Sequence, residues 1–165
     1  MKPKTSLSEH SLDEKNAEKE MQQFVTVTIA SQMFGIPVLQ IQDILAPQQT
    51  TRIPLAPKEV AGGLNLRGRI VTAIDIRNRL DLPPREKGDS SMNIVVEHGG
   101  ELYSLIVDQV GEVLSLPEGQ FEKDPTTMDA IWHDVSNGIY RLPDRLMLVL
   151  DVAKILTFDS PRRSS

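Results

Sequence analysis

The chain contains no cysteine and only three histidines among its 165 residues. The absence of cysteine excludes disulfides, thiol catalysis and cysteine-ligated metal ions. The histidines are His10, His98 and His133, and none shares a metal-binding spacing with another histidine or with a pair of carboxylates. The sequence therefore favours solvent-facing or structural roles for all three, and it predicts no metal site.

Long apolar runs and a basic charge are also missing. No apolar segment approaches the ~20 residues that a membrane-spanning helix needs, and the first residues, MKPKTSLSEHSLDEK, lack the apolar stretch of a secretory signal. We therefore expect a cytoplasmic protein. Aromatic content of 4% and a formal net charge of −5 disfavour nucleic-acid binding, which relies on stacking and on basic surfaces.

The two ends differ in composition from the middle. Residues 1–21 are rich in Lys, Glu, Ser and Gln and poor in large apolar residues, so we expect a mobile N-terminal tail. Residues 159–165 are expected to form a loose C-terminal tail. Between them, residues 22–158 suffice for one domain or two packed half-domains, and the Pro, Gly, Asp and Ser of residues 82–91 predict a linker.

This core carries one pattern twice. Residues 34–45 (FGIPVLQIQDIL) align in chemistry with residues 103–114 (YSLIVDQVGEVL), and residues 69–80 (RIVTAIDIRNRL) align with residues 145–156 (RLMLVLDVAKIL). The sequence thus predicts two similar subdomains, with a first repeat at about 24–80 and a second at about 93–156. A cleft between two subdomains is a common place for a ligand or partner.

Each copy has the features of a small β-barrel. Apolar and polar residues alternate before a turn at Ala30 to Gln32, and the turn HGGE at residues 98–101 predicts a second hairpin. Asp75 and Asp151 each follow a strand and precede a short helix-like stretch, which is where a helix N-cap belongs. Many short strands and few helices together predict two small barrels.

Motifs of catalysis are weak. Asp75 and Asp151 could act as paired acids in glycoside or acyl chemistry, but their duplicated position at strand ends favours the N-cap interpretation. Residues 62–69 (GGLNLRGR) have the glycines of a phosphate-binding loop without its Lys-Ser/Thr pair, and they precede a strand rather than a helix. No serine lies in a G-x-S-x-G frame. The sequence therefore predicts no enzyme.

Two segments have the composition of a partner surface. In residues 38–45 (VLQIQDIL), the apolar Leu39, Ile41 and Ile44 alternate with polar residues that include Asp43. This pattern is typical of a half-buried strand or a turn of helix. Arg67, between a leucine and a glycine, is in a position to pair with Asp43. Such an arginine is commonly a solvated charge, but arginine is also enriched at protein contact hot spots.

Five blocks in order resemble the family of the chemotaxis coupling protein CheW. The blocks are FxxxTIxxQxFGIPVLQIQDIL, TRIPLAP, VAGGLNLRGRIVTAIDIR, YSLIVDQVGEVLSL and DRLMLVLDVAKIL, and they run from Phe24 to Leu156. The resemblance implies two five-stranded SH3-like β-barrel subdomains with short helices, packed around a shared apolar layer. It also implies a non-catalytic adaptor without a cofactor, which bridges the cytoplasmic tips of chemoreceptors to the regulatory domain of the histidine kinase CheA.

The resemblance further implies a place in receptor arrays on the inner face of the membrane, with no nucleic-acid partner and no direct membrane insertion. The receptor groove of the family would carry over to eight positions, which are Ile41, Asp43, Asn65, Leu66, Arg67, Met92, Val110 and Val113. Asp43 stands where glutamate is usual in the family, so its reach toward Arg67 is one methylene shorter. Glu122 stands where a basic residue is expected, and the resemblance assigns no kinase-contact residue.

Other interpretations remain open at this point. The same fold forms the regulatory end of CheA and the first part of the CheV adaptors, which add a receiver domain, but only the nine residues 157–165 follow Leu156. The alternative is therefore a CheV-like or other chemosensory scaffold without a receiver domain. A small-barrel nucleic-acid-binding module and an enzyme are less favoured.

Overall fold

The computed structural model describes residues 20–123 and 129–157. The predicted N-terminal tail, residues 1–21, lies outside these ranges except for its last two residues, and Met21 already begins the first strand. The predicted C-terminal tail, residues 159–165, also lies outside them. No helix in the described part of the chain has the length and apolar character needed to cross a membrane.

Strands dominate the described residues, and each helix there is about one turn long. In chain order the elements are β1 (Met21–Ile29), β2 (Gln32–Pro37), the 3-10 helix η2 (Val38–Gln40), β3 (Ile41–Leu45), β4 (Val60–Leu66), β5 (Arg69–Asp75), α2 (Ile76–Arg79), β6 (Met92–His98), β7 (Glu101–Val107), β8 (Gln109–Pro117), the 3-10 helix η3 (Glu118–Gln120), β9 (Glu122–Lys123), α3 (Ala130–His133), β10 (Ser136–Arg141), β11 (Leu146–Leu150) and α4 (Val152–Leu156).

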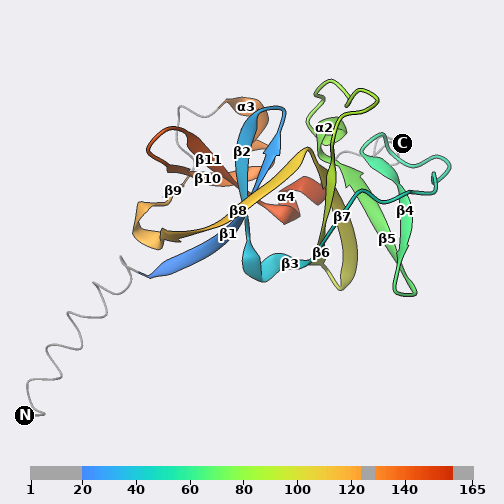
Figure 1. The fold of residues 1–165 in the computed structure, drawn as a ribbon, viewed down its shortest axis with the longest axis horizontal. Coiled ribbons are helices and arrows are strands. Elements are labelled where there is room, and N and C mark those ends of the chain that lie inside the picture. The colour runs from blue at the N-terminus through green and yellow to red at the C-terminus, as the bar shows by residue number, and fades with distance from the viewer. Residues whose placement is uncertain (1–19, 124–128, 158–165) are drawn as a thin grey trace, which may run out of the picture.

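The strands form two sheets that lie side by side (Figure 1). The six-stranded sheet has the order β8-β1-β2-β11-β10-β9, and the five-stranded sheet has the order β3-β6-β7-β5-β4. The predicted mainly β fold with two similar five-stranded barrels is confirmed, and the two-residue strand β9 is an addition to the first barrel. The first five strands of one sheet correspond in position to the five of the other.

Each sheet combines strands from both sequence copies. The hairpin β1-β2 of the first copy pairs with β8 and β11 of the second, and the hairpin β6-β7 of the second copy pairs with β3 and β5 of the first. The pairings of β2 with β11 and of β5 with β7 are parallel, and the others are antiparallel. The two copies are therefore intertwined, and neither sheet is built from one continuous stretch of chain.

Apolar side chains gather in three clusters. The central cluster takes residues from both sheets together with residues of α2 and α4, and α4 lies between the sheets (Figure 1). A second cluster, around Phe24, Tyr140 and Met147, belongs to the six-stranded sheet alone. A third, made by Leu64, Val71 and Ala73, belongs to the five-stranded sheet alone. Each barrel thus has its own small core, and the expected shared apolar layer joins them.

Both predicted hairpins are present. Ala30 and Ser31 have φ of 51° and 72° and join β1 to β2, and Gly99 and Gly100 have φ of 63° and 82° and join β6 to β7. Two consecutive residues with positive φ form the turn whose twist matches that of the flanking strands. The glycines adopt this conformation freely, whereas Ala30 and Ser31 adopt it at some steric cost.

Both predicted N-caps are also present. The carboxylate of Asp75 accepts a hydrogen bond from the Arg77 N–H at 3.0 Å, and that of Asp151 accepts one from the Lys154 N–H at 3.2 Å. These bonds satisfy backbone donors that the first turn of a helix leaves unpaired. The two aspartates are therefore part of the repeated fold, as the N-cap interpretation of the sequence predicts.

Candidate functional site

The turn between β4 and β5 presents an arginine at its tip. Arg67 and Gly68 have φ of 52° and 85°, and the side-chain oxygen of Asn65 accepts a hydrogen bond from the Gly68 N–H at 2.9 Å. A residue other than glycine in this left-handed region is uncommon. Asn65, one of the predicted site residues, thus holds the turn in shape, and the turn projects Arg67 outward.

Arg67 reaches the predicted acid. Its Nη2 atom lies 2.9 Å from Oδ2 of Asp43, and Oδ1 of Asp43 accepts a hydrogen bond from the Ile44 N–H at 2.9 Å. The Arg67 side chain is 75% exposed and that of Asp43 is 25% exposed. The predicted pairing of the two residues is confirmed, and the aspartate reaches the arginine despite its shorter side chain. The contact joins the two opposite edges of the five-stranded sheet, since β3 and β4 are its outer strands.

Three of the predicted apolar residues pack against the same large cluster. Ile41, Met92 and Val110 are half-buried, and all three pack against the central cluster between the sheets. In the five-stranded sheet, Ile41 begins β3 opposite Val96 and Met92 begins β6, so the two lie toward opposite ends of this antiparallel pair. Val110 stands near the beginning of β8 in the six-stranded sheet. They are therefore supplied by both sheets and lie where the shared apolar layer comes to the surface.

Two predicted residues differ from that group. Leu66 packs against the cluster of the five-stranded sheet, so its side chain contributes to that barrel rather than to the layer between the barrels. Val113 lies opposite Val25 in the pairing of β8 with β1 and is 53% exposed. Its exposure makes it available to a partner.

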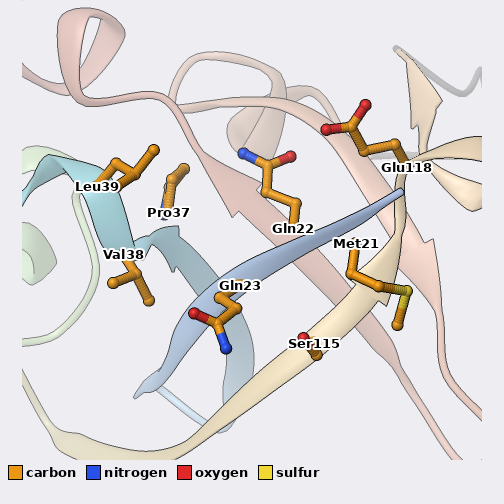
Figure 2. A pocket seen from close by; sticks show the side chains of 8 residues that line it. All are labelled: Met21, Gln22, Gln23, Pro37, Val38, Leu39, Ser115 and Glu118. Carbon is orange, nitrogen blue, oxygen red and sulfur yellow. The ribbon is translucent and has the colours of Figure 1, made fainter. Parts of the chain in front are cut away.

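A pocket of about 440 Å³ was not predicted, and its lining includes none of the eight predicted site residues. Figure 2 shows that β1, the end of β2 with η2, and the C-terminal part of β8 with η3 line it. The lining residues are Met21, Gln22, Gln23, Pro37, Val38, Leu39, Ser115 and Glu118. Leu39 is 95% exposed and Met21 is 52% exposed.

The pocket adjoins the predicted site through the chain itself. Leu39 precedes Ile41 by two residues, and Ser115 follows Val113 by two residues. Val38 also packs against the central cluster, as Ile41 does. The pattern of residues 38–45 predicted a half-buried strand or a turn of helix. Leu39 does lie in a helical turn, of the 3-10 type, but its side chain is exposed rather than half-buried.

The site carries few groups suited to proton transfer or metal binding. No set of three His, Cys, Asp or Glu residues in the described part of the chain is arranged to hold a metal ion. Near the pocket, burial first and then the charge of Glu118 raise the pKa of Tyr140, whose phenol is neutral at physiological pH. An apolar surface with an exposed ion pair is suited to binding another macromolecule.

Comparisons with known proteins indicate one family. A family model described as the CheW-like domain matches residues 23–159. The chemotaxis protein CheW of Klebsiella aerogenes is 30% identical over 136 residues, which are 82% of this chain and 82% of that protein. The chemotaxis protein CheW of Helicobacter pylori is 28% identical over 141 residues, which are 86% of this chain and 85% of that protein.

A solved structure is similar as well. The crystal structure of the scaffolding protein TtCheW from Thermoanaerobacter tengcongensis matches with a TM-score of 0.74 at 27% identity, and the match covers 84% of this chain and 94% of that one. The family match extends over both sheets and all eight predicted site residues. The chain therefore belongs to the family of proteins with a CheW-like domain.

Proposed function

We propose that this protein is a non-catalytic adaptor that couples the cytoplasmic tips of chemoreceptors to the regulatory domain of the histidine kinase CheA. It acts in the cytoplasm, at receptor arrays on the inner face of the membrane. The names of its relatives support a chemotaxis role, and the solved relative is described as a scaffolding protein. The observation that carries the proposal is a set of three half-buried apolar residues, Ile41, Met92 and Val110, which come from both sheets and which we call the rim. On β3 the rim adjoins the exposed pair of Asp43 and Arg67.

The rim suits a helical partner. A chemoreceptor tip is a helical hairpin, and a helix that docks in a groove anchors through apolar side chains recurring at three to four residues. Ile41 and Val110 are partly covered by the central cluster and can accept such anchors, since each retains an exposed part. Asp43 and Arg67 add a polar edge that restricts how the helix lies.

The test introduces a charge into the rim. Ile41→Glu and Val110→Glu are each titrated against a receptor tip fragment and, separately, against the CheA regulatory domain, after circular dichroism has confirmed the fold. Each should weaken receptor binding by more than ~1 kcal/mol, because an apolar contact is replaced by a charge that must be desolvated. Binding of the kinase domain should change less, because we assign it to a separate surface.

Leu146→Glu is the matched control. Leu146 is an apolar residue at the start of β11, 41% exposed, so it carries the same change of chemistry at a place outside the rim. It should leave receptor binding at the level of the unmodified protein. If folded Ile41→Glu and Val110→Glu both bind the receptor fragment normally, the rim is not the receptor site.

A further inference from the structure

Asp108 is the single residue between β7 and β8, where the chain leaves the five-stranded sheet and enters the six-stranded sheet. Its backbone is held on both sides of this crossing. The Asp108 N–H donates to the carbonyl oxygen of Thr28 at 3.0 Å, and its own carbonyl oxygen accepts a hydrogen bond from the Ser90 hydroxyl at 3.3 Å. The position of this residue therefore determines where β8 begins.

The carboxylate of Asp108 is bound by three donors from different segments. Arg77, in α2, reaches it with Nε at 3.0 Å and Nη2 at 2.7 Å. Arg85, in the predicted linker, reaches it with Nε at 2.9 Å. The Ala30 N–H, in the β1-β2 turn, donates to it at 2.8 Å. One carboxylate thus ties a helix and the linker to a turn of the other sheet.

Arg85 completes the cluster. Its Nη1 atom lies 3.0 Å from both carboxylate oxygens of Asp75, and its Nη2 atom donates to the carbonyl oxygen of Ile106 at 3.2 Å. The side chains of Arg77, Arg85, Asp75 and Asp108 are between 12% and 19% exposed. Two arginines and two aspartates balance in charge, and charge-assisted bidentate contacts have restrictive geometry. The cluster therefore allows little freedom in the relative placement of the segments it joins.

Four of the eight predicted site residues lie close in sequence to these segments or on a strand that pairs with one of them. Val110 follows Asp108 by two residues, and Met92 follows Ser90 by two residues. Ile41 and Asp43 lie on β3, which pairs with β6 in the other sheet. β8 begins directly after the crossing at Asp108, and β3 is held on β6 of the other sheet, so the crossing links the placement of these two strands.

We propose that Asp108, held by Arg77 and Arg85, is a positioning residue for partner recognition, which sets the spacing between β8 and β3 and so the shape of the rim. This inference rests on the proposed function for its consequence in receptor binding. The spacing itself is independent of any partner. Loss of the carboxylate should let β8 adopt more than one placement, because two arginines then face a neutral amide in a partly buried site.

The spacing can be measured directly, because the protein contains no cysteine and two introduced cysteines would be the only sites for spin labels. Gln42→Cys on β3 and Glu112→Cys on β8 place labels on exposed positions of the two walls. In the Asp108→Asn background, pulsed electron paramagnetic resonance should give a broader distance distribution or a mean shifted by about 2 Å or more. The same substitution, without labels, should weaken binding of the receptor tip fragment about fivefold or more.

Arg85→Gln is the second variant. It retains the contact between Arg77 and Asp108, so we expect it to fold even if Asp108→Asn fails to fold. It should change distance and affinity in the same direction by less. Ser104→Ala is the control for stability alone, because it removes the buried hydrogen bond of 2.8 Å from Asn93 to Ser104 without touching the crossing. It should lower the melting temperature and leave the distance distribution unchanged.

The outcomes separate the two proposals. An unchanged distance distribution in folded Asp108→Asn or Arg85→Gln would overturn the positioning role, whatever the binding result. A changed distribution with unchanged receptor affinity would overturn its link to recognition. Normal receptor binding by Ile41→Glu and Val110→Glu, together with a changed distribution in Asp108→Asn, would reject the receptor site and leave the control of spacing intact.

Discussion

The two copies of the repeated unit differ in what their equivalent acids contact. Asp43 and Asp75 in the first copy correspond to Glu112 and Asp151 in the second. Asp43 pairs with Arg67 and Asp75 pairs with Arg85. Across residues 20–123 and 129–157, neither Glu112 nor Asp151 has an arginine or lysine side chain as a partner.

This difference distinguishes the contacts that belong to the repeated barrel fold from the contacts that belong to the candidate site. Both aspartates that end a strand cap a helix, so the cap belongs to the repeated fold. Asp43 and Asp75 belong to the five-stranded sheet, whereas the six-stranded sheet, with Glu112 on β8 and Asp151 directly after β11, has the same strand order without an arginine contact at these two positions of the described chain. We therefore interpret the exposed pair of Asp43 and Arg67 as part of a recognition surface. We interpret the partly buried cluster around Asp108 as the group of residues that positions the strands of that surface.

The largest effect on the free energy of unfolding is expected when the two capping aspartates, Asp75 and Asp151, are each replaced. Asp75→Ala removes a cap and one of the two carboxylates that bind Arg85, so it should lower the free energy of unfolding by about 2 kcal/mol or more. Asp151→Ala removes a cap alone and should lower it by about 1 kcal/mol. Urea denaturation of both variants checks this. Equal losses would show that the arginine contact adds nothing to the first copy.

A smaller effect is expected from pH. Burial alone would raise the pKa of Asp108, but hydrogen bonds from Arg77 and Ala30, together with the charge of Arg85, lower it below its ordinary value. A carboxylate with a lowered pKa in the folded state stabilises the protein above its unfolded pKa of about 4. This contribution is lost as the pH falls through the folded pKa.

Denaturation at a series of pH values checks the predicted direction of this pH dependence. The unmodified protein should lose stability on acidification below about pH 4 more steeply than Asp108→Asn, because the variant has no carboxylate to protonate there. Parallel pH profiles for the two proteins would mean that Asp108 titrates alike in the folded and unfolded chains.

The smallest effect on folding is expected at the exposed pair. Arg67→Gly removes a contact that contributes only about 0 to 1 kcal/mol at such an exposed site. It also relieves a positive φ of 52°, which glycine adopts without steric cost. The free energy of unfolding should therefore stay within about 1 kcal/mol of the unmodified protein, while receptor binding weakens. A thermal melt together with a receptor titration checks both parts, and unfolding of Arg67→Gly would make Arg67 structural.

Local patterns predicted much of the fold. Two-residue turns, strand alternation and N-caps depend on neighbours in sequence, and the hairpins at Ala30 and at Gly99 and the cap at Asp75 were all predicted. The pairing of Asp43 with Arg67 was predicted because both stood among apolar residues in segments resembling one family.

Contacts between distant segments were not predictable in the same way. The pairing of β8 with β1 joins residues about 90 positions apart, and strand periodicity carries no information on such a partner. Arg85 stands among Pro, Gly and Ser in a segment with the composition of a linker, so its contacts with Asp75 and Asp108 had no sequence signal. The pocket at Leu39 was missed because the pattern of residues 38–45 predicted a half-buried side chain there, whereas Leu39 is exposed on a 3-10 turn.

The most direct test of the account compares Asp43 with its counterpart in the second copy. Asp43→Ala and Glu112→Ala are titrated against the same receptor tip fragment by calorimetry, after both have been shown to be folded. Asp43→Ala should weaken binding about fivefold or more, which corresponds to the loss of about 1 kcal/mol at an interface, and Glu112→Ala should bind as the unmodified protein does. Equal affinity for Asp43→Ala and the unmodified protein, or an equal loss in both variants, would contradict the claim that the pair of Asp43 and Arg67 marks the recognition surface.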